Sequence, residues 1–242
     1  MGHWIYDFQT LITGLLAVGA AFYAARFAQK QVNAANSQIE VAREQIAVAK
    51  TQSDHERGAR LRAARASLPT TLSSICEFAQ EAGKTLHAAW PSAAKLYPED
   101  HHSNSVQPVK ADLPLFPYEL LESLERIVEL TDAEDVAERI ESILREAQIF
   151  SARTRPLVAG TDINTDLLAI HIIQAAALYA RAESLFTYAR RKTPGVNSAN
   201  LWDRVFAALT LMRVDDPAVL KEAQRQRELG LPPGEADSVE PD

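Results

Sequence analysis

Near its start the chain carries a long apolar stretch without a charged residue. Asp7 and Arg26 enclose 18 consecutive uncharged residues. A helix rises about 1.5 Å per residue, so a run of this length matches the apolar core of a bilayer. We therefore predict a transmembrane helix over residues 8–28, preceded by a short extracytoplasmic N-terminus over residues 1–7. The alternative is a helix buried in a protein core.

Basic residues indicate how this helix is oriented. Residues 1–7 contain no Lys or Arg, whereas Arg26, Lys30 and Arg43 follow the span closely. Basic residues close to a span stay in the cytoplasm, and a cleaved signal peptide needs basic residues ahead of its apolar stretch. We expect a retained single-pass anchor in the inner membrane, with the N-terminus outside and the C-terminus in the cytoplasm.

A seven-residue repeat follows the apolar stretch. QVNAANS, QIEVARE and QIAVAKT start at Gln31, Gln38 and Gln45. Each copy has a β-branched first core position and an Ala at the second, the pattern of a left-handed coiled coil. Extended back into the span, the frame meets small residues that let two backbones approach closely. The predicted oligomer seam consists of Leu11, Gly14, Val18, Ala21, Val32, Ala35, Ile39, Ala42, Ile46 and Ala49.

The stalk that carries the repeat, residues 29–66, has two interpretations. It pairs with further copies of the chain, or it is a long amphipathic helix that packs on the chain's own following domain. β-branched residues at the first core position favour parallel dimers. We prefer self-association, so the expected partners are the lipid bilayer and one or more further copies, in a homodimer or higher homo-oligomer.

The stalk ends in a basic stalk patch formed by Arg57, Arg60, Arg62 and Arg65. About 30 helical residues, or roughly 45 Å, separate it from the predicted edge of the membrane. Charges are screened over about 8 Å at physiological salt, so anionic lipid is too distant to bind it. We expect these side chains to face solvent, the chain's own acidic domain or a protein partner.

Helical periodicity dominates residues 67–229, the predicted cytoplasmic domain. Five prolines make residues 91–117 an irregular loop, and the acidic, Pro-rich residues 230–242 predict a disordered tail. Thr131 and Glu134 have the spacing of a capping box. The fold class is therefore all-α, with a stalk helix and a bundle of about six cytoplasmic helices. Apolar steps of three and four predict helices over 69–90, 118–130 and 132–155, from Thr161 or Asn164 to 192, from Ser198 or Asn200 to 212, and over 215–229.

Composition narrows the possible functions. The net charge of −7 argues against nucleic acid as a partner, since binding it requires a basic surface. A single Cys excludes a disulfide framework and a Cys-based zinc site within one chain. The layout looks like that of many bacterial single-pass membrane proteins, and 18 Arg against 7 Lys agrees with such a source. This likeness concerns architecture alone.

Few residues in the sequence are candidates for catalysis or metal binding. His101 and His102 lie beside two acidic residues, but adjacent ligands cannot close one tetrahedral metal site without others. His171 and Cys76 fall on apolar helix faces and are expected to be buried core residues. Glu119, Glu122, Glu125 and Glu129 share one helix face, which we expect to be solvated. We therefore predict no catalytic, cofactor-binding or metal-binding residue.

These patterns lead to three hypotheses of different classes. The first is a non-enzymatic membrane-anchored scaffold or adaptor that self-associates through its span and stalk and presents its helical domain to a possible cytoplasmic protein partner. The second is a membrane-tethered sensor whose helical domain binds a small ligand. The third is an enzyme with a helical active site that uses Glu and His residues of the central helices.

Overall fold

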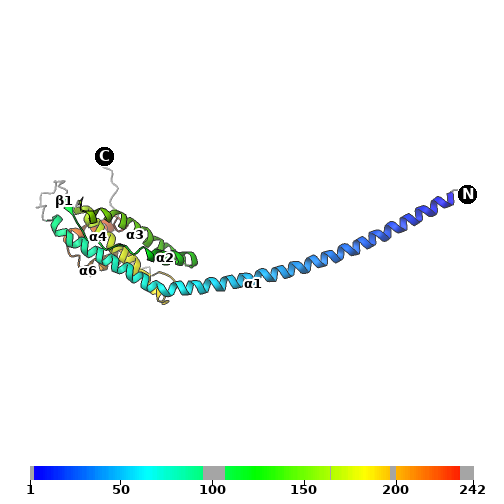
Figure 1. Ribbon diagram of the computed structural model, residues 1–242, viewed down its shortest axis with the longest axis horizontal. Helices are drawn as coiled ribbons and strands as arrows, with labels where there is room; N and C mark the ends of the chain where they lie inside the picture. The colour runs from blue at the N-terminus through cyan, green and yellow to red at the C-terminus, as the bar shows by residue number, and fades with distance from the viewer. Residues whose placement is uncertain (1–2, 95–106, 164, 197–199, 235–242) are drawn as a thin grey trace. The chain divides into compact units, whose positions relative to one another are not determined.

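The computed structural model describes residues 3–94, 107–163, 165–196 and 200–234. The chain comprises two units, Met1–Arg57 and Gly58–Asp242. Within the described residues every regular element is a helix except for one short pair of strands (Figure 1). The predicted all-α class is therefore confirmed for this part of the chain.

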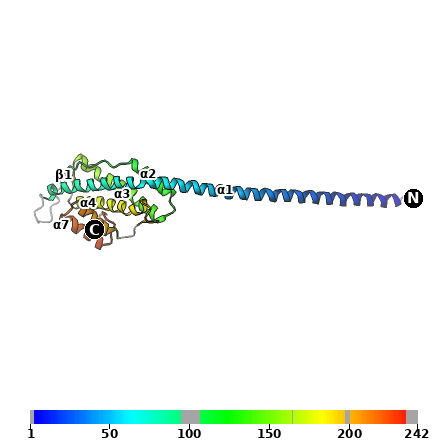
Figure 2. The same cartoon turned by 90° about the horizontal axis from the view of Figure 1, so that it is seen from below.

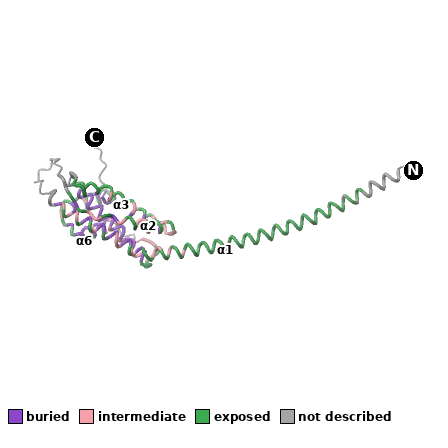
Figure 3. Tube along the Cα trace, viewed as in Figure 1, coloured by how far each residue is buried: buried purple, intermediate pink, exposed green. Residues whose placement is uncertain are grey.

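The first unit is one uninterrupted helical segment. Helix α1 runs from His3 to Ala94, and its residues up to Arg57 form this unit. Ala, Gln and Glu predominate over residues 28–57, and no Pro interrupts them, so helix propensity is high. Every described side chain from Thr13 to Arg57 is exposed, as the green tube in Figure 3 shows.

The predicted membrane span receives no support from the described residues. Among them, no helix has a stretch that is both apolar enough and long enough to cross a membrane. The side chains of residues 8–12, 15 and 17, which belong to the predicted span, lie outside the description. The coarser prediction of a helix over residues 8–28 agrees with α1.

The second unit contains the rest of α1 and the remaining elements. Strands β1 (Gln107–Val109) and β2 (Thr161–Ile163) pair antiparallel, with Gln107 opposite Ile163 and Val109 opposite Thr161. Its other helices are α2 (Glu119–Leu130), α3 (Glu134–Ala159), α4 (Thr165–Ser184), α5 (Phe186–Ala189), α6 (Leu201–Leu211) and α7 (Pro217–Glu228).

Helix α4 is the centre of this unit. It contacts α3, α5, α6 and α7, and Figures 1 and 2 both draw it among neighbouring helices. A helix that is apolar on all sides must be covered on all sides. Its fully buried apolar residues include Leu168, Ile172, Ile173, Ala175 and Ala176.

The second half of α1 packs onto this core along one stripe. Phe78 meets the ring edges of Phe116 and Phe150 at centroid distances of 4.9 and 5.9 Å, which joins α1 to α3 and to the chain before α2. The buried residues of this stripe recur every three or four positions, as predicted. Its fully buried members are Leu68, Leu72, Ile75, Ala79, Ala82 and Leu86.

Two predicted helix starts are wrong. Helix α1 continues through Pro69, where we expected a new helix, because the buried leucines on either side offset the one hydrogen bond that a proline removes. Helix α3 begins at Glu134, and Thr131 Oγ1 accepts from the backbone N–H of Ala133 at 3.2 Å. Thr131 therefore closes the turn before the helix and forms no capping box.

The predicted helix that runs to residue 192 is interrupted. Thr161, one of its two expected starts, belongs to β2, whereas α4 begins directly after the other, Asn164, and ends at Ser184. The Ser184 hydroxyl donates to the carbonyl of Arg181 at 2.6 Å, and Leu185 N–H bonds to the carbonyl of Ala182, one residue short of the α-helical spacing. A side chain that competes for a helical carbonyl favours such a break.

Candidate functional site

The predicted seam lies along the exposed first half of α1. Val32, Ile39 and Ile46 are 57%, 50% and 68% exposed. The alanines of the second core position and the described seam residues nearer the N-terminus are also exposed. The side chain of Leu11 lies outside the described residues. The structure thus places the seam on a helix and leaves its apolar side chains uncovered.

Within the basic stalk patch, Arg65 contacts the end of helix α5. Its guanidinium lies 3.9 Å from the centre of the Tyr188 ring. Nε donates to the Tyr188 carbonyl at 2.8 Å, and Nη2 donates to the same carbonyl and, at 3.2 Å, to that of Thr193. The carbonyls at a helix C-terminus lack intrahelical partners and carry partial negative charge. Arg65 therefore fastens α1 to the chain that leaves α5.

The other arginines of the patch do not join Arg65 in one site. The carbonyl of Arg62 accepts from Arg191 Nη2 at 3.5 Å. Arg60 borders a hollow of about 580 Å³ between α1 and α2, together with Arg126 and two glutamates of α2. Arg57 belongs to the first unit. The four residues were predicted as one patch, and the structure assigns them separate surroundings.

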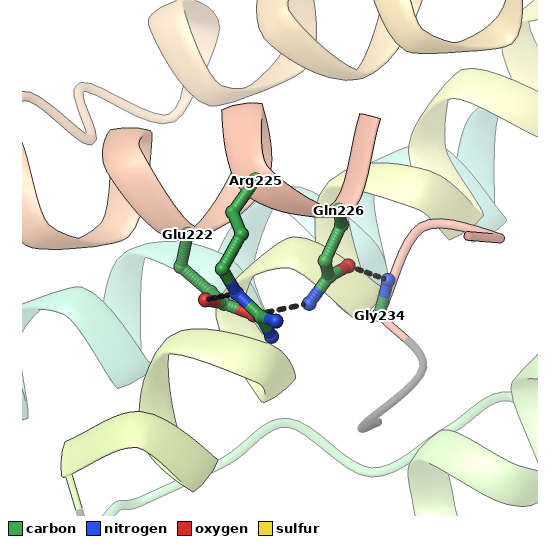
Figure 4. Close-up of polar contacts among 4 residues, drawn as sticks. All are labelled: Glu222, Arg225, Gln226 and Gly234. Carbon is green, nitrogen blue, oxygen red and sulfur yellow. Dashed lines mark hydrogen bonds and ion pairs between the residues drawn. The ribbon is translucent and has the colours of Figure 1, made fainter. Parts of the chain in front are cut away.

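A buried polar cluster that the sequence did not reveal holds the chain after α7. Gln174 Nε2 donates to the carbonyl of Gly234 at 2.8 Å, and Gln226 Oε1 accepts from its N–H at 2.8 Å. Figure 4 shows Gln226 between Gly234 and Glu222, whose Oε1 accepts from Gln226 Nε2 at 2.9 Å. His171 Nδ1 lies 3.1 Å from Gln174 Oε1. Residues 230–234 thus depart from the predicted disordered tail, because both backbone groups of Gly234 have buried partners.

We expect Gly234→Ala to destabilise the second unit by about 2–3 kcal/mol. Gly234 has φ of +81°, and an added Cβ would overlap Gln174 Cγ and lie 3.0 Å from its Cα. Gly230→Ala is the matched control, since Gly230 has φ of +69° with nothing within 4 Å of its Cβ position. Urea unfolding followed by tryptophan fluorescence measures both. Equal losses would show that backbone strain alone acts at Gly234.

The surroundings of the two candidate core residues favour their uncharged forms. Burial lowers the pKa of His171, opposed by its hydrogen bond to Gln174. Burial, aided by the carboxylates of Glu183 and Glu77, raises the pKa of the Cys76 thiol to about 12. The Cys76 thiol therefore stays protonated near neutral pH and is not a nucleophile there.

We expect the Cys76 thiol to reduce stability at high pH. An unfolded thiol ionises near pH 9.0, and the folded one near 12. Below pH 9 both states bind the proton and the stabilising contribution is complete, whereas it is lost as the pH rises from 9 to 12. Urea unfolding at pH 8 and pH 10.5 should show a smaller loss for Cys76→Ala than for the parent chain. Equal losses of stability in the variant and the parent chain would contradict this role of the Cys76 thiol.

The remaining candidates lie outside the described residues or on an exposed helix face. His101 and His102 lie outside the described residues. Glu119, Glu122, Glu125 and Glu129 are exposed on α2. Among the described residues, no group of three or more His, Cys, Asp or Glu side chains could hold a metal ion.

Two further hollows open beside α6. One, of about 500 Å³, lies between α4 and α6 and is bordered by Tyr179, Ala207 and Leu211 among others. The other, of about 150 Å³, lies where α5 and its following turn meet Arg204 of α6. The second is bordered mainly by charged and hydroxyl side chains, so it has the more distinctive chemistry.

Comparison of the chain with protein-family models, with curated proteins and with solved structures gives no match.

Proposed function

We propose that the chain is a single-pass, membrane-anchored scaffold or adaptor that self-associates through its span and stalk. The observation that carries this proposal is the exposure of Val32, Ile39 and Ile46 at seven-residue intervals on one helix. Contiguous exposed apolar surface on a protein usually marks a contact with another protein or with lipid. Here the regular spacing favours another helix.

A second copy of the chain is the occupant that fits the seam. An apolar face that repeats every seven residues follows a left-handed supercoil and drifts by about 20° per repeat from the face of a straight helix. A covering helix must have the same period to stay in contact. The seam itself supplies that period, so two copies are complementary over successive repeats.

Charges beside the seam favour a parallel arrangement. The positions that flank the core on one side are Arg43, Lys50 and Arg57, and those on the other side are Gln38, Gln45 and Gln52. In a parallel pair each cation lies beside a glutamine of its partner. In an antiparallel pair the cations would face one another, and facing like charges oppose association.

The estimated free energies indicate that the stalk and the span act together in self-association. Six Val and Ile side chains of the pair, each already partly covered by its own helix, contribute roughly 5–10 kcal/mol on burial. Association costs about 4–15 kcal/mol. The stalk alone is therefore marginal, and anchoring both copies in one membrane raises their effective concentration.

The proposed anchor is the uncharged run of residues 8–25 and its continuation to residue 28, oriented with the N-terminus outside and residues 29–242 in the cytoplasm. Leu16, Val18 and Phe22 are 69%, 72% and 64% exposed, so they are available to lipid or to the paired span. Expression with a C-terminal tag in a bacterial host tests this part. We expect the chain in the pellet after alkaline carbonate extraction, with the tag protected in spheroplasts. Recovery in the soluble fraction would overturn the anchor.

Cysteine crosslinking in membranes tests self-association. Ile39→Cys and Ile46→Cys, each made in a Cys76→Ala background, should form disulfide dimers on mild oxidation. In a parallel, in-register pair both positions meet their own copy at a distance that a disulfide can bridge. An antiparallel pair would crosslink at no more than one of them.

Ser37→Cys and Thr51→Cys are the matched controls. Both residues are exposed on the face of α1 opposite the seam, and they should remain monomeric under the same oxidation. Equal crosslinking at all four positions would indicate random collision. Its absence at Ile39 and Ile46 would refute the proposed pairing.

A further inference from the structure

The smaller hollow beside α6 combines positive charge with unused hydrogen-bonding atoms. Its volume is about 150 Å³. Arg204 borders it from α6, the last two residues of α4 border it from another side, and α5 and the following turn supply the rest. The bordering residues are Glu183, Ser184, Phe186, Thr187, Arg190, Lys192 and Arg204.

The backbone after α5 positions two of the cations. Arg191 adopts a left-handed conformation with φ of +57°, and Lys192 N–H then bonds to the Thr187 carbonyl at 2.9 Å. This is the closing geometry of a helix C-terminus. It brings Lys192 back beside Thr187, while the Arg190 guanidinium lies 5.1 Å from the centre of the Phe186 ring.

Positive charge exceeds negative charge at this hollow. Three cations, Arg190, Lys192 and Arg204, border it with the single carboxylate of Glu183, which forms an ion pair with Arg204 Nη1. The hollow therefore has a formal charge of about +2 at neutral pH.

Two buried polar atoms at the hollow lack partners. Arg204 Nε and Thr187 Oγ1 are inaccessible to solvent and have no hydrogen-bond partner among the described residues. Leaving such a group unsatisfied is costly, and buried polar atoms in folded proteins are normally paired. The guanidinium N–H can only donate, so its missing partner is an acceptor, and the hydroxyl can donate to the same kind of group.

We infer that this hollow binds a phosphate-type dianion. Such a group supplies two negative charges against the excess of about two positive charges, and it has several acceptor oxygens for the guanidinium and the hydroxyl. The group could belong to free phosphate or to the headgroup of phosphatidic acid, which shares its chemistry. The inference does not depend on the seam, so either proposal can fail alone.

Thermal unfolding of the full chain in detergent, with inorganic phosphate as the probe, tests this site. At constant ionic strength, phosphate should raise the unfolding temperature saturably, because it binds only the folded state, whereas chloride should not. Lys192→Ala should weaken the apparent affinity roughly 5- to 10-fold, and Arg190→Gln combined with Lys192→Ala should weaken it further.

Lys221→Ala is the matched control, since Lys221 is exposed on α7 and the substitution removes the same charge. It should leave the phosphate affinity unchanged. Lipid vesicles then distinguish the sources: competition by phosphatidic acid but not by phosphatidylcholine indicates a headgroup, and no competition indicates free phosphate. A phosphate effect that does not saturate, or that Lys192→Ala and Lys221→Ala reduce equally, would overturn the inference.

Discussion

Arg181→Ala is expected to lower the free energy of unfolding of the second unit by about 3–5 kcal/mol. Arg181 Nη2 lies 3.3 Å from Glu146 Oε1, and their side chains are only 6% and 17% exposed. The pair joins α4 to α3 within the core. Removing the guanidinium leaves the carboxylate of Glu146 mostly buried without this partner, and its desolvation is no longer offset.

A double variant that replaces both members of this pair distinguishes the loss of the ion pair from the cost of leaving one buried charge without its partner. Arg181→Met with Glu146→Leu removes both charges and retains apolar volume, so we expect it to recover much of the lost stability. Arg225→Ala is a control for an exposed pair, since Arg225 bonds to Glu222 three residues earlier on α7, and should cost less than about 1 kcal/mol. Urea unfolding can follow the buried Trp90 and Trp202. A double variant no more stable than Arg181→Ala would contradict this account.

Phe78→Ala is expected to lower the free energy of unfolding by about 3–5 kcal/mol. Phe78 is 7% exposed and meets two other rings edge to face. The substitution removes those contacts and leaves a cavity between α1, α3 and the chain before α2. The same urea unfolding experiment measures the loss.

Leu115→Ala is the natural comparison for Phe78→Ala. Leu115 lies beside Phe116 in sequence but is 93% exposed, so its truncation should change stability by less than about 0.5 kcal/mol. Phe78→Leu keeps most of the apolar volume and should fall between the two. A loss at Phe78 no larger than that at Leu115 would show that the aromatic cluster is not part of the cooperative core.

The buried helix faces could be predicted because they depend on local periodicity. The stripe from Leu68 to Leu86 was expected, and its members are buried. The run of apolar residues in α4 likewise indicates a helix that is covered on all sides, and α4 contacts four others. In both cases the pattern lies within one helix, so no knowledge of distant residues is required.

Contacts between residues that are far apart in the sequence could not be predicted, because no local pattern indicates them. Arg65 and Tyr188 are 123 positions apart, and neither belongs to a recurring motif. Gln226 is polar and lies in a helix with many charged residues, so no local pattern indicates that it is fully buried where the chain turns back after α7. The anion hollow depends on the left-handed conformation of Arg191, which sequence rules assign mainly to glycine and asparagine.

The bonds to Gly234 also define where the chain can be shortened. A protein that ended at residue 229 would retain all of α7 but would lose both backbone groups that pair with Gln174 and Gln226. Two amide side chains would then be left in the core with unmet hydrogen-bonding capacity. A stop codon placed after Gly234 preserves them, so the shortest chain that keeps both bonds ends six residues beyond the end of α7 at Glu228.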